Sequence, residues 1–152
     1  MTNNHQLQCP DSPWVKNALT FITNHTNVPN YSDHIAVVRF LLNGHCGINN
    51  RTSIRNILNH LNNPNLNRES FQQRILVELK RAGVVATLVY PGPRGGVFIP
   101  CNENEVKQVV RQVLDRVNQE IQNLLGILLG TQMETLIGDF QTDIKRVVDN
   151  LP

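Results

Sequence analysis

The sequence contains few of the residues that build a disulfide framework or an aromatic-rich surface. Three of its 152 residues are cysteine, and aromatic residues make up 5% of the chain. Cys9, Cys46 and Cys101 are an odd number without close pairing, so their spacing indicates neither a disulfide framework nor a metal clip. We therefore expect buried or incidental thiols.

Long apolar runs are also missing. No stretch approaches the ~20 apolar residues that a helix needs to cross a bilayer. Residues 1–10 are polar and lack the apolar segment of a signal peptide. These absences predict a cytoplasmic protein that has no membrane partner.

Residue patterns typical of catalysis are lacking as well. The five histidines are scattered, with no HExxH spacing and no paired carboxylates beside them. The glycine-rich segment 91–96 does not match the GxxxxGK[ST] pattern of a phosphate-binding loop. We expect a protein that is not an enzyme and has no catalytic residues, metal site or cofactor.

The charge is unevenly distributed along the chain. The formal net charge is only +2, yet residues 51–94 contain seven basic and two acidic residues, which gives +5. Residues 101–152 contain five basic and eight acidic residues, which gives −3. A basic middle segment favours a phosphate-rich partner. The acidic C-terminal segment is not expected to bind phosphate and indicates a different role.

Apolar spacing predicts four helices in the first 82 residues, over 13–25, 32–43, 50–61 and 67–82. Ser12 and Pro13 have the residue types preferred at a helix start, and Asn50 and Asn67 are expected as further N-caps. On the fourth helix, the spacing places Phe71, Ile75, Leu79 and Ala82 on the buried face.

A β-hairpin is expected after Gly83. Residues 84–90 are rich in β-branched and aromatic residues, and 97–99 form a second short run of the same kind. The connection between them, Pro91-Gly-Pro-Arg-Gly-Gly96, is typical of a turn. Gly47-Ile48 is expected to form a further short strand.

Two apolar helices are expected after the hairpin. Asn102 and Glu105 predict a capping box that opens a long helix, and Thr131-Gln-Met-Glu134 predicts a second one. Positions 106, 110, 113, 117, 121, 124 and 128 follow nearly heptad spacing. Helices this apolar must pack on each other, on the preceding domain or on a second copy.

The element order over 31–100 resembles the winged-helix domain, the helix-turn-helix variant that carries a β wing. The expected fold is mainly α with a small β-hairpin (α+β): a winged core with an N-terminal helix and two C-terminal helices. The domains would be a tail and short helix at 1–30, the winged helix at 31–100 and a helical dimerisation region at 101–152.

The resemblance implies sequence-specific binding of double-stranded DNA. Winged-helix proteins place the second helix of the motif in the major groove and the hairpin along the backbone or minor groove. Carried onto this sequence, the recognition helix is 67–82 and the wing is 84–99. The implied DNA-binding residues are Arg51, Arg55, Asn67, Arg68, Ser70, Gln73, Arg74 and Arg94.

A DNA reader with one recognition helix usually gains affinity by dimerising. We expect a nucleoid-associated homodimer that acts as a small bacterial transcriptional regulator, and nothing in the sequence identifies an effector. The alternatives are a winged-helix protein–protein interaction module, a non-catalytic subunit of a larger complex, and C-terminal helices that cap a monomer. The expected dimerisation residues are Val106, Val110, Val113, Val117, Ile121, Leu124, Leu128, Ile137, Phe140 and Ile144.

Overall fold

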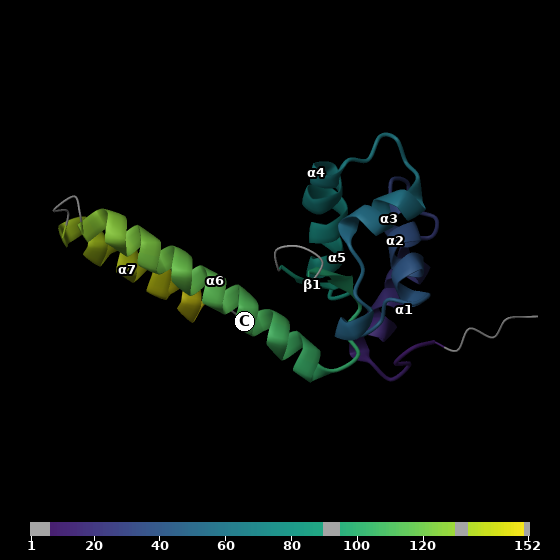
Figure 1. Cartoon of the computed structure of the whole chain (residues 1–152), viewed down its shortest axis with the longest axis horizontal. Helices are drawn as coiled ribbons and strands as arrows, with labels where there is room; N and C mark the ends of the chain where they lie inside the picture. Colours follow the sequence, from purple (N-terminus) through teal and green to yellow (C-terminus); the bar gives the residue numbers. More distant parts are fainter. Residues whose placement is uncertain (1–6, 90–94, 130–133, 151–152) are drawn as a thin grey trace, which may run out of the picture. The chain divides into compact units, whose positions relative to one another are not determined.

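The computed structural model describes residues 7–89, 95–129 and 134–150, which form helices and one two-stranded hairpin (Figure 1). The chain divides into two compact units, Met1–Val110 and Arg111–Pro152. Mainly helical structure with a small antiparallel hairpin confirms the expected α+β class. The elements are α1 (Pro13–His25), α2 (Ser32–Leu42), η1 (Ile48–Asn50), α3 (Ile54–Leu61), α4 (Arg68–Ser70), η2 (Phe71–Leu76), α5 (Val77–Arg81), β1 (Ala86–Leu88), β2 (Gly96–Phe98), α6 (Glu103–Leu129) and α7 (Glu134–Asp149).

The first unit has one apolar core, to which α1 contributes. Val15, Ala18 and Phe21 of α1 are buried together with residues from α2, α3, the helix over 68–81, strand β2 and the segment just before β1. The helices therefore bury the faces on which the regularly spaced apolar residues lie. Burial of this side-chain cluster positions the helices and the hairpin.

Local signals set the start of two helices as the sequence predicted. The Ser12 hydroxyl accepts a hydrogen bond from the Val15 N–H at 3.3 Å, and Pro13 is the first helical residue. The Asn67 side chain accepts from the Ser70 N–H at 2.8 Å, and the Ser70 hydroxyl accepts from the Asn67 N–H at 3.1 Å. This reciprocal pair satisfies two donors that a helix start leaves free.

The segment before α3 differs from the prediction. Gly47-Ile48 is not a strand, because Ile48–Asn50 form a 3₁₀ turn, and Asn50 is not the cap of α3. Ser53 is the cap instead, and its hydroxyl accepts from the Asn56 N–H at 3.1 Å. The Asn50 amide donates instead to the Cys46 carbonyl at 2.8 Å.

The helix over 68–81 changes its winding in the middle. Phe71–Leu76 adopt a π-helical turn, in which hydrogen bonds span five residues instead of four. The wider turn brings Leu76 into the core beside Ile75, although Leu76 was not expected on the buried face. Ala82, which was expected there, is exposed, because the helix ends at Arg81.

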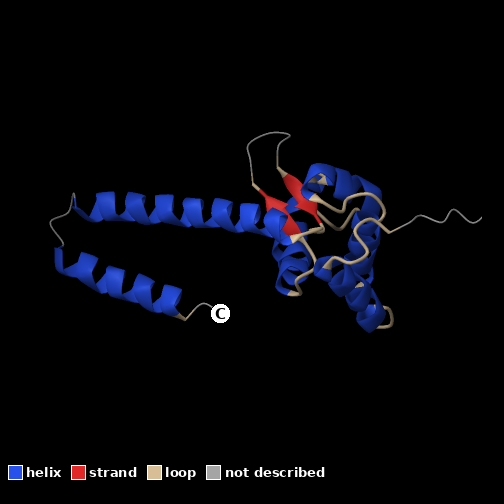
Figure 2. Cartoon of the chain, turned by 90° about the horizontal axis from the view of Figure 1, so that it is seen from below, coloured by secondary structure: helices blue, strands red, loops and turns tan. Residues whose placement is uncertain are grey.

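The hairpin lies at one edge of the helical unit (Figure 2). β1 and β2 are antiparallel, with Thr87 opposite Val97. A third extended piece joins them, because Thr52 and Val97 exchange two backbone hydrogen bonds of 2.9 and 2.8 Å. The turn residues between the strands, including Arg94, lie outside the described residues.

Cys9 and Cys101 form a disulfide, so the expectation of incidental thiols was wrong for these two residues. They are 92 positions apart, and sequence spacing alone cannot show that folding brings them together. The Ser12 hydroxyl donates to the Pro100 carbonyl at 2.6 Å, which holds the two segments side by side. Cys46 is buried and free, as expected.

The first turn of α6 is attached to the first unit through Glu105. Its carboxylate accepts from the Ile48 N–H at 3.1 Å and from the Cys101 N–H at 2.8 Å. The Asn102 side chain caps the helix by accepting from the Glu105 N–H at 3.1 Å. The prediction of Asn102 as cap is confirmed, although Glu105 reaches one residue further back than a capping box requires.

In the second unit, α7 runs antiparallel to α6 (Figures 1 and 2). The residues that join the two helices, including Thr131 of the second expected capping box, lie outside the described residues. Within the described part of the chain, no helix is long and apolar enough to cross a membrane.

Candidate nucleic-acid interface

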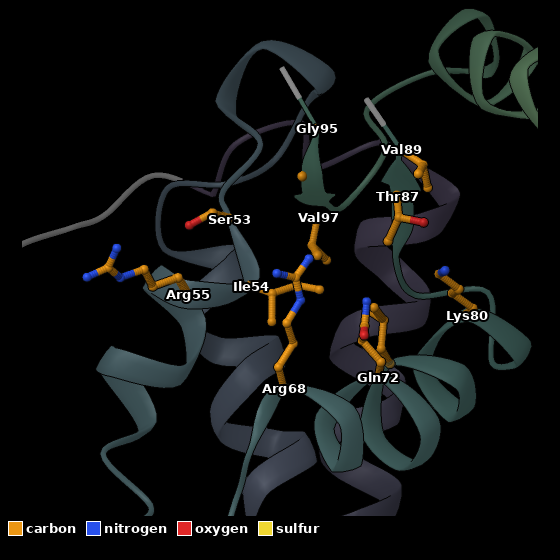
Figure 3. A pocket seen from close by; sticks show the side chains of 12 residues that line it. Ser53, Ile54, Arg55, Arg68, Gln72, Lys80, Thr87, Val89, Gly95 and Val97 are labelled. Carbon is orange, nitrogen blue, oxygen red and sulfur yellow. The ribbon is translucent and has the colours of Figure 1, made fainter. Parts of the chain in front are cut away.

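An open depression of about 300 Å³ lies between the helix over 68–81, the start of α3 and the hairpin. The helix contributes a row spaced by four residues along one flank: Arg68, Gln72, Leu76 and Lys80. Thr87 and Val97 line the hairpin side. Figure 3 shows Arg68 and Gln72 pointing from the helix toward the strands.

The depression is basic. Its described lining residues include Arg55, Arg68 and Lys80 and no acidic residue. The surrounding protein desolvates the Lys80 ammonium, which lowers the pKa of Lys80. The three cations, with no acidic residue among the described lining residues, give the depression a positive potential, which favours a negatively charged ligand.

Two of the expected DNA-binding residues, Ser70 and Gln73, have hydrogen bonds within the protein. The Ser70 hydroxyl accepts from the Asn67 N–H and donates to the Asn67 carbonyl, both at 3.1 Å. The Gln73 amide donates to a Glu69 carboxylate oxygen at 3.1 Å. Asn67 and Ser70 therefore hold the helix start, and Gln73 is joined to an acidic neighbour on the exposed side of the helix.

The expected arginines do not all lie at one place. Arg68 points into the depression, whereas Arg55 lines its edge and points away (Figure 3). Arg51 precedes α3 and donates to the Ile48 carbonyl at 2.8 Å. Arg74 is exposed on the same helix as Arg68 but does not line the depression. Arg94 lies outside the described residues.

The opposite flank of the helix faces α2. His34 is buried, and its Nε2 atom lies 3.0 Å from a carboxylate oxygen of Glu78. Desolvation by burial lowers the pKa of His34, against the opposing effect of Glu78. The two flanks therefore differ: one packs on the core through a buried histidine, and the other is open and basic.

Sequence reasoning missed Gln72, Lys80 and Thr87 as lining residues. The apolar spacing indicated which face of the helix is buried but not which side of the exposed face turns toward the hairpin. Arg68 and Lys80 are polar positions that share the four-residue spacing of Leu76. That shared spacing was the available signal.

α6 carries the second exposed feature, a stripe of large aliphatic side chains. They are between 47% and 66% exposed. Val106 and Ile121, also expected in the dimer seam, are half-buried, and the side chains of Leu128, Ile137, Phe140 and Ile144 lie outside the described residues. The exposed members of the stripe are Val110, Val113, Leu114, Val117, Leu124 and Ile127.

The described residues contain no group of three or more histidines, cysteines or acidic residues that could hold a metal ion. Among the described side chains, the polar and charged groups of the depression are amide, hydroxyl, guanidinium and ammonium groups. These groups suit hydrogen bonds and ion pairs with an anionic partner.

Comparison with known proteins shows the family to which the chain belongs. The chain is 42% identical over 153 residues to "Putative control protein C.MjaVP" of Methanocaldococcus jannaschii, an archaeon. The match covers 98% of this chain and 93% of C.MjaVP. The chain belongs to the C.MjaVP family. No protein-family model matches it, and no solved structure does. The C.MjaVP match therefore spans both the basic depression and the apolar stripe.

Proposed function

We propose that this member of the C.MjaVP family is a transcriptional regulator that binds double-stranded DNA and is not an enzyme. The observation that carries the proposal is the depression in which Arg68 and Lys80 face the hairpin without an acidic residue among the described lining residues. Its relative carries the name "Putative control protein C.MjaVP", which supports a regulatory role. Within the cell, such a protein would be associated with the nucleoid.

The order of elements supports a winged-helix assignment. After α2 comes the extended residue Thr52, then α3, the helix over 68–81 and the hairpin. In this arrangement, the second helix of the motif enters the major groove and the hairpin follows the backbone. The depression lies between these two elements, where a phosphate backbone would pass.

The lining residues divide into two roles. Arg68 and Lys80 are cations and would contact phosphates, which fix the position of the protein on the duplex. Gln72 has an amide that can donate to and accept from an adenine edge. Arg74 and Arg81 are exposed on the same helix and could extend the contact beyond the depression.

We further propose that the regulator is a homodimer. The exposed aliphatic stripe on α6 is a surface that a soluble protein rarely leaves uncovered. A second copy would cover it and would place two recognition helices on one duplex. Half-sites would then be separated by about one helical turn or a multiple of it.

Selection of bound sequences from random duplex DNA tests the proposal. We expect enrichment of an inverted repeat, because a symmetric dimer reads two equivalent half-sites. Enrichment of a single unrepeated site would retain DNA binding and contradict the dimer. If no sequence is enriched and no duplex is retained at ~50 mM salt, where phosphate contacts are strong, DNA binding fails and a protein-interaction module replaces it.

A further inference from the structure

Most residues of the exposed aliphatic stripe on α6 follow a regular spacing along the helix. Apart from Leu114, which lies beside this row, the stripe residues Val110, Val113, Val117, Leu124 and Ile127 follow one another by 3, 4, 7 and 3 residues. Glu120 fills the gap, and it too is exposed. The six positions together alternate steps of three and four, which is the a and d pattern of a helix-packing seam.

Glu120 is therefore the charged position in an otherwise apolar seam. A carboxylate between two packed helices needs a partner of opposite charge. Arg116 precedes Glu120 by four residues and is exposed beside the stripe on the same helix. Positions adjacent to a seam commonly carry the charges that set helix orientation.

We infer that α6 packs against α6 of a second copy in the antiparallel direction, about a two-fold axis between Val117 and Glu120. This inference rests on the homodimer proposed above and specifies its geometry. The antiparallel register pairs Val110 with Ile127, Val113 with Leu124 and Val117 with Glu120, so each of these six seam positions has a counterpart.

Charge decides between the two directions. In a parallel pair, equivalent seam positions meet, so the two Glu120 carboxylates would lie against each other and repel. In the antiparallel pair, each Glu120 lies almost level with Arg116 of the other copy, on the same edge of the seam. Two symmetric ion pairs replace one repulsive contact.

Because α7 returns antiparallel to α6, the dimer would be a bundle of four helices with the two copies of α6 in contact. The half-buried residues Ile121 and Leu125 lie on α6 beside the stripe rather than in it. The second copy would then cover the part of α6 that the chain itself leaves exposed.

Cysteine cross-linking measures the direction. We would prepare Val110→Cys and Ile127→Cys separately, oxidise each alone and as an equimolar mixture, and treat the wild type in parallel as the control. The antiparallel dimer predicts a covalent dimer in the mixture and none in the other three samples. Self-linking of Val110→Cys and of Ile127→Cys would show a parallel seam, and absence of linking in every sample would also overturn the register.

A charge reversal provides an independent readout by sedimentation. Glu120→Lys should raise the dimer dissociation constant at least tenfold, because the new lysine faces the partner's Arg116, and adding Arg116→Glu should restore it. Asp115→Lys, on another face of α6, is the matched control. A parallel seam would leave Glu120→Lys unchanged, since one like-charge pair replaces another. A wild type that sediments as a 17 kDa monomer would contradict the dimer itself, whereas DNA binding is measured separately.

Discussion

Cys9 and Cys101 are joined by a disulfide that connects the N-terminal segment to the residue just before the cap of α6. The link encloses most of the first unit, since the two residues are 92 positions apart. A cross-link of this span removes much of the freedom of the unfolded chain. The disulfide is therefore expected to stabilise the first unit, and it joins the start of α6 to the N-terminal segment.

Reduction of this disulfide should destabilise the first unit by about 4 to 5 kcal/mol, the value that loop-closure entropy gives for a loop of this length. Urea unfolding with and without a thiol reductant measures the change. The variant Cys9→Ser/Cys101→Ser should unfold like the reduced wild type and should be insensitive to reductant. Equal stability of the oxidised and reduced wild type would contradict this role.

His34 should make the protein less stable in acid. Burial lowers the pKa of His34 below its ordinary value of 6.5, so the unfolded chain binds a proton there before the folded chain does. The contribution of neutral His34 to the free energy of unfolding is therefore fully present above about pH 6.5. It falls as the pH decreases, by at most about 1.4 kcal/mol per pH unit for one proton. His34→Gln should flatten the decrease between pH 7.5 and 5. If the wild type and the variant lose stability in parallel, His34 is not the cause.

Gly96 should not tolerate a side chain. A Cβ atom there would lie 2.8 Å from the Thr52 carbonyl oxygen, which itself pairs with Val97. Gly96→Ala should therefore cost about 1 to 3 kcal/mol by overpacking. Gly126→Ala on α6 is the matched control, because its Cβ would meet nothing within 4 Å and alanine favours a helix. Similar melting temperatures for the two variants would contradict the close approach.

These features show how far the sequence determined the fold and where it did not. Helix starts at Ser12 and Asn67 depend on side chains within three residues, so local chemistry predicts them. Ser53 replaced Asn50 as a cap because pairing of Thr52 with Val97 extends the preceding segment. The disulfide and the π-helical turn at Leu76 depend on tertiary packing, which no local pattern contains.

The candidate site was predictable to a similar degree. The pattern of a basic helix followed by a hairpin predicted the region of the candidate interface, and it included Arg68 among the binding residues. Gln72 and Lys80 were missed because their orientation depends on where the hairpin docks. The stripe on α6 was recognised as apolar, but its heptad register through Glu120 required knowledge of which side chains remain exposed.

Lys80 should make duplex binding sensitive to alkaline pH. Desolvation lowers the pKa of Lys80, so in the free protein it loses its proton at a lower pH than an ordinary lysine. A nearby phosphate favours the charged form of Lys80. The affinity for duplex DNA should therefore decline as the pH rises through the pKa that Lys80 has in the free protein. Lys80→Arg should shift that decline to higher pH, because arginine stays charged. Identical profiles, measured by fluorescence anisotropy, would exclude Lys80 from the interface.

The most direct test of the DNA-binding depression is the salt dependence of duplex affinity. Each phosphate contact contributes about 0.9 to the slope of log K against log salt. Arg68→Gln/Lys80→Gln should reduce the slope by roughly two. Arg39→Gln/Lys107→Gln removes the same charge from exposed positions outside the depression and should leave the slope unchanged. Equal slopes for the two double variants would contradict the proposed interface.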